Sequence, residues 1–378
     1  MKRKNRSAFG SLIRLVFTDL VLTGIALLVF AYFHHVKPSQ LEPVGTTSSR
    51  YEAGAAETLK NTPAAFHTPE PSPSPSPSPK AAETDATLSE PLNTEPAAVT
   101  PVPALTPAAT VLPTPSPTPD PVGYFGSRHK EQFTDGEIIR EDNRYVSSNL
   151  SVTLTTHREN GVVYHVADFY IRDISSFKTV FANDKYGKGY SEWLLSADKR
   201  TNSVLTINGD FYGLRNYGVI IRNGTLYRTM KNAICDYLVL FWDGTMKIYG
   251  PGPVDTDSLM AAGAYQSWYF GPMLLDENGG TMTEFNSDLT RRNPRSAIGY
   301  FEPGHYCFVM VEGRSNVSRG VTLSELSEIM NSLGCTVAYN LDGGETAQLA
   351  FQSETVSALI DGGRKCSDFI IISEPDTP

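Results

Sequence analysis

Residues 313–344 read GRSNVSRGVTLSELSEIMNSLGCTVAYNLDGG, and this stretch decides how the C-terminal part of the chain folds. Thr322, with Glu325 three residues later, has the pattern of a capping box at the start of a helix. Gly334 suits the left-handed conformation that ends many helices. Between them, apolar residues recur at helical spacing at Leu323, Leu326, Ile329, Met330 and Leu333. The stretch therefore predicts an amphipathic helix over residues 322–333.

A short strand is expected directly after this helix. Residues 335–339 are mostly apolar and β-prone, so we expect a strand that is buried on both faces. Ligands of open sheets bind beyond the carboxyl ends of the strands, and Asp342 falls at that position. Gly343 and Gly344 follow it and allow the backbone to approach a ligand closely. The alternative interpretation is a tight Asp-Gly turn without a chemical role.

The first residues of the chain have the pattern of a membrane anchor. Residues 1–14 are rich in Lys and Arg, and the apolar run that follows is long enough to cross a bilayer, with Asp19 as its one charge. We predict that residues 1–14 stay in the cytoplasm and that residues 15–36 form a transmembrane signal anchor. The C-terminal part would then be extracytoplasmic, on the cell membrane. A cleaved signal peptide is the alternative interpretation.

Residues 37–123 differ in composition from both flanking parts. They are rich in Pro, Ser, Thr and Ala and contain few aromatic residues, so they cannot bury enough apolar surface to offset the entropy cost of ordering. Their Ser-Pro and Thr-Pro repeats favour extended polyproline II conformation, which acts as a semi-rigid spacer. We predict a disordered stalk that holds the following domain away from the membrane.

The composition changes again at Tyr124, and residues 124–378 are enough for one domain with a single core. Helical patterns are few, at residues 191–196 and 322–333. Turn signals for β-hairpins occur at Asn160-Gly161, Asn223-Gly224 and Asp243-Gly244. We therefore predict an α+β fold, in which a mixed sheet of many strands is covered by a few helices.

Charge and cysteine content exclude some classes of function. The net charge of the chain is −9, and no basic stripe indicates a nucleic-acid partner. The four cysteines are widely spaced and have no metal-ligand pattern. Two of them, Cys307 and Cys335, lie in apolar runs, and we interpret them as small core residues. No cofactor is expected, although a divalent cation stays open as an alternative.

Polar residues gather at four predicted strand ends. An amide and a carboxylate around Gly209 could hold sugar hydroxyls, although a Gly-rich turn with core aromatics is the alternative. Arg295 precedes another strand, and arginine suits bidentate recognition of phosphate. Glu312 and Arg314 flank a glycine at the end of a third strand, where a surface ion pair is the alternative. The polar positions are Asn208, Asp210, Arg295, Glu312, Arg314, Arg364 and Asp368.

Five motifs in series resemble those of the phosphodiester glycosidase family. The resemblance runs from about residue 205 to residue 372, and it implies hydrolysis of a sugar-1-phosphodiester, of the N-acetylglucosamine-1-phosphate type, at the sugar–oxygen bond. Two positions depart from the family pattern, since Glu345 and Asp210 stand where the family has glycine. The motifs are Asn208-Gly-Asp-Phe-Tyr212, Asn293-Pro-Arg-Ser-Ala-Ile-Gly299, Glu312-Gly-Arg314, Ser318-Arg-Gly-Val-Thr-Leu323 and Asn340-Leu-Asp-Gly-Gly344.

A mechanism can be assigned to these residue types. The leaving group departs as a phosphomonoester, which is already a weak base, so neutralising its charge matters more than protonating it. We expect Asp342 or Glu312 to be the nucleophile or general base. The residues expected to bind substrate are Asn208, Gly209, Asp210, Arg295, Arg314, Gly343, Gly344, Arg364 and Asp368.

Two other classes of function stay open. One is a non-catalytic module that binds sugar-phosphate polymers of the envelope, with Glu345 marking the loss of turnover. The other is a phosphodiesterase that cuts the phosphorus–oxygen bond with a divalent ion held by Asp210, Glu312 and Asp342. In each case the expected partners are a phosphodiester-linked glycan or envelope polymer and, through the N-terminal helix, the membrane.

Overall fold

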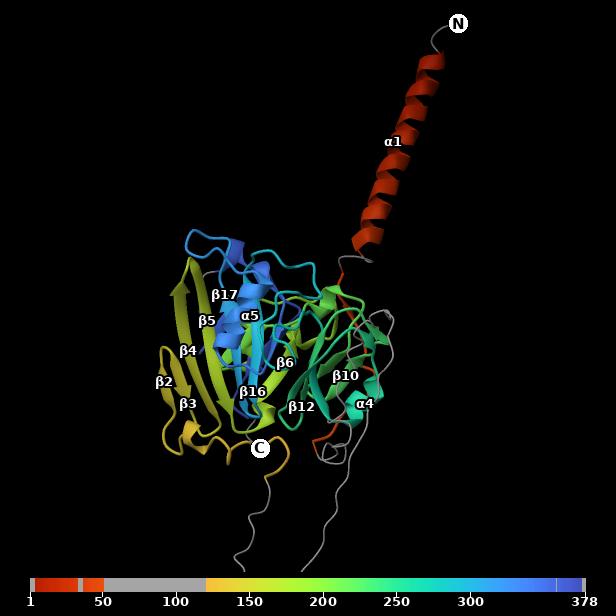
Figure 1. Ribbon diagram of the computed structural model, residues 1–378. Helices are drawn as coiled ribbons and strands as arrows, with labels where there is room; N and C mark the ends of the chain where they lie inside the picture. Colours follow the sequence, from red (N-terminus) through yellow and green to blue (C-terminus); the bar gives the residue numbers. More distant parts are fainter. Residues whose placement is uncertain (1–3, 33–36, 51–119, 358, 376–378) are drawn as a thin grey trace, which may run out of the picture. The chain divides into compact units, whose positions relative to one another are not determined.

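The computed structural model describes residues 4–32, 37–50, 120–357 and 359–375 (Figure 1). Helix α1 spans Lys4–Ala31, and residues 14–31 have a mean hydropathy of 2.0, so they are long and apolar enough to cross a membrane. The predicted apolar helix is present, but it starts within the predicted basic segment and ends before residue 36. Residues 51–119 of the predicted stalk lie outside the described residues.

The largest element of the domain is a seven-stranded sheet, whose strands lie beside one another in Figure 1. Every strand pair that the structure describes is antiparallel, so the predicted mixed sheet is wrong in this respect. The order is β18 (Val337–Asn340), β16 (Arg295–Glu302), β17 (His305–Val311), β5 (Val162–Ile171), β4 (Leu150–Glu159), β3 (Arg144–Val146) and β2 (Ile139–Glu141).

A five-stranded sheet packs against the inner face of the first sheet. Residues of both sheets, such as Phe169, Phe308, Ile207 and Ile370, belong to one buried apolar cluster. This continuous core fixes the relative positions of strand ends that are distant in the sequence. The order is β20 (Glu354–Thr355), β19 (Leu349–Phe351), β8 (Leu205–Asn208), β21 (Asp368–Ile372) and β6 (Phe177–Phe181).

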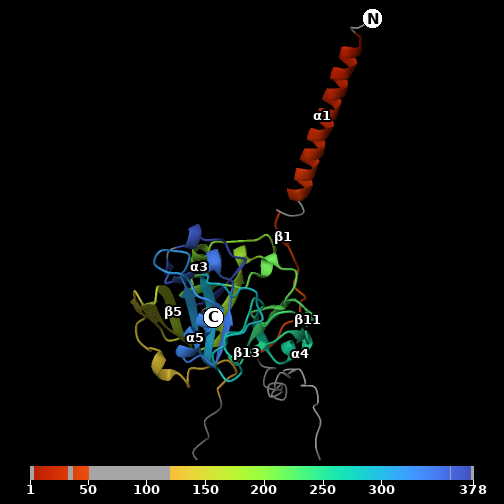
Figure 2. The same cartoon turned by 45° about the horizontal axis from the view of Figure 1, so that its top comes forward.

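Helices cover the outer faces of these two sheets. On the seven-stranded sheet, α5 (Leu323–Ser332) buries Leu326 and Met330 against apolar residues of the strands. On the five-stranded sheet, α3 (Leu194–Thr201) packs in the same way through Leu194 (Figure 2). The helices and strands thus form an α+β fold, as the sequence predicts, although α3 begins later than the predicted helix at 191–196.

Smaller elements complete the domain. A three-stranded sheet, a β-hairpin and α4 share a separate apolar cluster. Their bounds are β13 (Met246–Tyr249), β12 (Tyr237–Phe241), β15 (Ala264–Trp268), β9 (Ile220–Arg222), β10 (Thr225–Arg228) and α4 (Thr256–Ala261). Two short pairs join β1 (Ser39–Gln40) to β7 (Gly187–Lys188) and β11 (Asn232–Ala233) to β14 (Gly252–Pro253). Short 3-10 turns are η3 (Lys130–Gln132), η4 (Ile174–Ser176), η5 (Ala182–Asp184), η6 (Tyr212–Leu214), η7 (Gly344–Thr346) and η8 (Ile360–Gly362).

Local sequence signals account for the helix–strand unit that presents Asp342. The predicted capping box is confirmed, because the Thr322 hydroxyl accepts from the Glu325 amide and the Glu325 carboxylate accepts from the Thr322 amide. Gly334 has a φ of +84°, as expected for a helix stop. The strand that follows is β18, an edge strand antiparallel to β16, so Asp342 does lie beyond its carboxyl end.

The predicted hairpins are also present. Asn160-Gly161 and Asn223-Gly224 have positive φ at both residues and join β4 to β5 and β9 to β10. At Asp243-Gly244, which joins β12 to β13, the glycine has a φ of +82°. Cys307 and Cys335 are buried, as predicted, with their sulfurs 3.7 Å apart.

The structure corrects the predicted boundary of the stalk. Residues 37–50, which the composition assigns to the stalk, pair with the domain through β1 and β7 and through an isolated bridge from Thr47 to Thr225. Composition alone could not reveal this, because the partners lie more than a hundred residues away in the sequence.

The capping box makes a direct prediction for stability. We expect Thr322→Ala to lower the free energy of unfolding by about 1 kcal/mol, because the Glu325 amide loses its acceptor. Glu328→Ala, at an exposed position of the same helix, is the control and should change it by less than about 0.5 kcal/mol. Urea unfolding measures both. Equal effects of the two substitutions would contradict the assigned role of the cap.

Candidate active site

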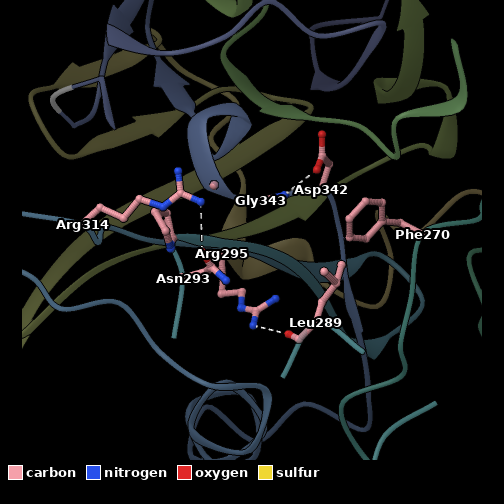
Figure 3. A pocket seen from close by; sticks show the side chains of 9 residues that line it. Phe270, Leu289, Asn293, Arg295, Arg314, Asp342 and Gly343 are labelled. Carbon is pink, nitrogen blue, oxygen red and sulfur yellow. Dashed lines mark hydrogen bonds between the residues drawn. The ribbon is translucent and has the colours of Figure 1, made fainter. Parts of the chain in front are cut away.

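A pocket of about 150 Å³ lies where β16 begins and β18 ends. It contains Asp342, which the sequence places at this strand end, and the two glycines after it. The side chains around it come from several parts of the domain (Figure 3). The lining residues are Phe270, Leu289, Asn293, Pro294, Arg295, Arg314, Asp342, Gly343 and Gly344.

Asn208 holds the strand ends under this pocket together. Its amide nitrogen donates to the backbone carbonyl of Asp342 at 2.8 Å, and its side-chain oxygen accepts from the Ser296 hydroxyl at 2.6 Å. The residue is fully buried, so it positions the Asp342 loop and does not reach a ligand. Gly209 is equally constrained, since a Cβ there would lie 2.4 Å from the Asp368 carboxylate.

Asp342 presents its carboxylate to the pocket from a buried position. Its side chain is only 12% exposed, and one oxygen accepts from the Gly343 amide at 2.9 Å. Burial raises the pKa of Asp342 to about 6, although the Thr346 hydroxyl and the guanidinium groups of Arg364 and Arg215 act in the opposite direction. A carboxyl group with a pKa near neutrality is suited to act as a general base or nucleophile.

Arg314 supplies positive charge on one side of the pocket. Its backbone has a φ of +54°, which is unusual for a residue with a side chain and is typical of functional sites. The guanidinium donates to the Asn293 side chain at 3.1 Å and lies 3.5 Å from Asp361 and 3.9 Å from Glu345. It is 43% exposed, so it is accessible to an anionic ligand.

Arg295 has a different environment. Its guanidinium is directed toward the backbone of the preceding loop (Figure 3), where it donates to the carbonyls of Leu289 and Arg291 at 2.5 and 2.7 Å. Burial lowers the pKa of Arg295 to about 10. These contacts fix the loop at the pocket wall and leave the guanidinium few free donors for the predicted phosphate contact.

Two further arginines face Asp342 together with aromatic rings. Arg364 lies 3.6 Å from the Asp342 carboxylate and stacks over Phe211, with 5.6 Å from its guanidinium carbon to the ring centroid. Arg215 stacks over Phe270 at 4.8 Å. Arg215 was not among the residues predicted from the sequence, and the available signal was its place three residues after the Asn208–Tyr212 motif.

Asp210 and Asp368 lie beneath the pocket rather than in its lining. Each accepts a hydrogen bond from the Arg222 guanidinium, at 2.9 and 2.8 Å, and all three side chains are 1% exposed. Burial and the neighbouring Asp210 carboxylate raise the pKa of Asp368 to about 7, against the effect of Arg222. The triad supports the Tyr269 backbone, whose amide donates to Asp210 at 2.7 Å.

Glu312 is also absent from the lining of this pocket. Its carboxylate hydrogen-bonds with Nε2 of His165 at 2.9 Å, and Nδ1 of the same ring contacts the Thr156 hydroxyl at 2.9 Å. His165 could not be predicted as the partner, because it lies on another strand, β5, far from Glu312 in the sequence. Among the residues that the structure describes, no group of three His, Cys, Asp or Glu side chains is arranged to hold a metal ion.

The arrangement defines a class of site: a buried carboxylate with arginines and aromatic rings around it. Residues 201–373 match the family model described as phosphodiester glycosidase. This confirms the resemblance inferred from the five motifs.

Individual proteins resemble the chain over part of its length. The SPbeta prophage-derived uncharacterized protein YomE of Bacillus subtilis (strain 168) is 35% identical over 201 residues, which are 50% of this chain and 31% of that protein. The chain therefore spans about a third of the length of this curated relative.

Solved structures resemble part of the chain at low sequence identity. The zebrafish N-acetylglucosamine-1-phosphodiester alpha-N-acetylglucosaminidase catalytic domain, auto-inhibited by its pro-peptide, is 18% identical, with a TM-score of 0.47 over 60% of this chain and 83% of that one. A hypothetical protein from Synechocystis is 14% identical, with a TM-score of 0.44 over 60% and 62%.

The buried triad makes a prediction about stability. We expect Arg222→Met to lower the free energy of unfolding by about 3–5 kcal/mol, because it leaves Asp210 and Asp368 buried without a cation. The triple substitution Asp210→Asn, Arg222→Met and Asp368→Asn should recover part of this loss. Urea unfolding at pH 7 measures both proteins. A single variant as stable as the parent would contradict the assigned role of Arg222.

Proposed function

We propose that the domain hydrolyses a sugar-1-phosphodiester by cleaving the bond between the anomeric carbon and the phosphate oxygen. The observation that carries this proposal is the buried Asp342 carboxylate in a pocket that Arg314 also lines, with the Arg364 guanidinium 3.6 Å from the same carboxylate. A carboxylate can act as nucleophile or general base at the anomeric carbon, and guanidinium groups can bind a phosphate.

Asp342 is the carboxylate that acts at the anomeric carbon. It either attacks this carbon and forms a glycosyl ester, which water then hydrolyses to the free sugar, or removes a proton from a water that attacks the carbon directly. In both cases the bond from carbon to the phosphate oxygen breaks with its electron pair going to oxygen. The product is a phosphomonoester, which is a weak base, so one carboxylate suffices where ordinary glycosides need two. This fits a pocket in which Asp342 is the acidic lining residue, while Glu312 pairs with His165.

The arginines bind the phosphate of the substrate, and an aromatic ring binds its sugar. Arg314 and Arg364 are both partly exposed and neutralise the charge on the phosphate. Phe270 lines the pocket, is partly exposed and has Arg215 over its ring, so its apolar surface suits the apolar side of a sugar ring. A substrate of the N-acetylglucosamine-1-phosphate type has both groups, a sugar ring and a phosphate joined to its anomeric carbon.

The cellular location is part of the proposal. With Lys and Arg residues preceding the apolar segment of α1, the domain would lie outside the cytoplasm, anchored to the cell membrane, and act on a phosphodiester-linked glycan of the envelope. Protease added to intact cells should then degrade the domain, and its survival there would count against this location.

A non-catalytic binding module is the main competing function, and the Asp342 carboxylate distinguishes the two. We expect Asp342→Asn to reduce hydrolysis of an N-acetylglucosamine-1-phosphodiester by about 10²–10⁴-fold. In the unsubstituted protein, activity should be lost as the pH falls through about 6, because Asp342 becomes protonated there. Initial rates of sugar release between pH 4 and 9 measure both effects.

Two control variants accompany this experiment. Asp361→Asn removes an exposed carboxylate beside Arg314, at a position with positive φ, which asparagine tolerates. This variant should lose activity at low pH in the same way as the unsubstituted protein. Glu312→Gln should cost far less activity than Asp342→Asn. Full activity of Asp342→Asn, or tight binding without sugar release by the parent protein, would refute the proposed hydrolysis.

Glu345 gives a second prediction, because its carboxylate competes with a phosphate for Arg314. The two side chains approach to 3.9 Å and are both about 40% exposed. We expect Glu345→Gln to lower KM about two- to fivefold at low ionic strength, with little change in kcat and with the effect fading at 1 M salt. Glu354→Gln, at an exposed position of β20, is the control. An unchanged or higher KM for Glu345→Gln would show that Glu345 does not compete.

A further inference from the structure

Residues 38–50 lie against the domain as an added strand. Their partners in the domain are more than a hundred residues away in the sequence. Ser39 and Gln40 pair with β7, and the Val44 and Ser48 amides donate to the carbonyls of Leu226 and Gly224 at 3.0 and 2.8 Å. The Leu226 amide returns a hydrogen bond to the carbonyl of Thr46 at 2.8 Å. This segment, here called the strap, therefore extends the β9–β10 hairpin in the way that bound peptides extend an exposed sheet edge.

Side chains fasten the C-terminal end of the strap. The buried Ser48 hydroxyl donates to the carbonyl of Ala264 and accepts from the Trp242 indole at 3.0 Å. Arg50 forms a bidentate pair with Asp173, at 2.9 and 2.7 Å, and its guanidinium lies over the Trp242 ring. A two-pronged ion pair of this kind, about a fifth exposed, fixes geometry as well as adding energy.

The domain surface is shaped for this occupant. A Cβ at Gly187 would lie 2.1 Å from the carbonyl oxygen of Ser39, and one at Gly189 would lie 3.2 Å from Pro38. The missing side chains at these two glycines leave the space through which the strap passes. Such close backbone approach marks a docking surface built for the strap and distinguishes it from a chance surface contact.

The described residues on either side of positions 51–119 contact the same residue, Asp173. Arg50 binds the Asp173 carboxylate, and after the segment Tyr124 forms a backbone bridge with Asp173. The adjacent Ile174 amide donates to the carbonyl of Gly123 at 2.8 Å. The described residues on both sides of positions 51–119 thus contact the domain at one place, and residues 37–50, which contact it first, are the part of the domain nearest to α1 in the sequence.

The length of chain between α1 and the strap is short. Ser39 follows Ala31 by eight residues, which reach at most about 28 Å when fully extended. A polyproline spacer over residues 37–123 would reach roughly 260 Å. The domain therefore stays close to α1 if residues 38–50 attach it, and can lie far from α1 if residues 37–123 form the connection.

We propose that the strap is the mechanical link between α1 and the domain, and that it holds the domain close to α1 even when the chain is cut between residues 51 and 119. With α1 anchored as proposed above, the active site works within a few tens of ångströms of the membrane surface. Its substrate is then a phosphodiester-linked sugar carried near that surface, rather than one at a distance across the envelope.

Controlled cleavage of the full chain tests this link. An affinity tag at the N-terminus immobilises the detergent-solubilised protein, and a specific protease site is inserted after residue 90. After cleavage we expect most of the C-terminal fragment to stay on the resin. In a second version the site lies between residues 33 and 36, ahead of the strap, and cleavage there should release the domain at once.

Variants of the strap complete the test. Ser48→Ala combined with Arg50→Ala should speed release after cleavage at residue 90 at least fivefold, since the side-chain contacts to Ala264, Trp242 and Asp173 are lost. Glu42→Ala, at an exposed strap position, should not change the rate. The midpoint of thermal unfolding of each released domain shows whether a variant has failed to fold.

Each result decides for or against the strap. Equal release from the two cleavage positions would overturn the proposal, and so would retention after cleavage ahead of the strap, because the domain would then be held by another contact. These readouts do not depend on catalysis. An inactive protein with a working strap would refute only the proposed hydrolysis, and an active protein without retention would refute only the strap.

Discussion

The side chain of Asn208 joins three chain segments beneath the pocket, and the candidate site depends on this junction. Its amide and oxygen contact the Asp342 carbonyl and the Ser296 hydroxyl, while the Gln348 amide approaches the same oxygen at 3.4 Å. All of these groups are buried, so a lost partner would cost the full desolvation of a polar group. The junction therefore sets the position of Asp342 relative to β8 and β16, and with it the geometry of the reacting carboxylate.

The site is held in conformations that do not favour stability by themselves. Phe211, whose ring lies under Arg364, and Arg314, which lines the pocket, both have positive φ, which is costly for residues with side chains. Burial of Asp342 disfavours its charged form, and the surrounding arginines offset this only in part. Rigid neighbours such as the Asp210–Arg222–Asp368 triad, which supports the Tyr269 backbone, maintain these features.

Local signals predicted much of the fold, and long-range contacts explain what they could not. The capping box at Thr322, the Asn-Gly hairpins and the strand end at Asp342 depend on residues close in sequence, and all are present. The roles of Arg222 and Arg215 depend on distant partners that only the assembled sheets reveal. The sequence also led us to expect Arg295, Asn208 and Asp210 in contact with substrate. In the structure their polar groups instead bond to other parts of the protein, which are distant in sequence or could not be foreseen from it.

The bond that is broken distinguishes this account from the phosphodiesterase alternative. Hydrolysis of an N-acetylglucosamine-1-phosphodiester in water labelled with oxygen-18, followed by mass spectrometry of both products, identifies that bond directly. With Asp342 acting at the anomeric carbon, the label should appear in the released sugar and not in the phosphomonoester. Label in the phosphomonoester would show attack at phosphorus and would contradict the assignment of Asp342 and its surrounding arginines to sugar–oxygen bond cleavage.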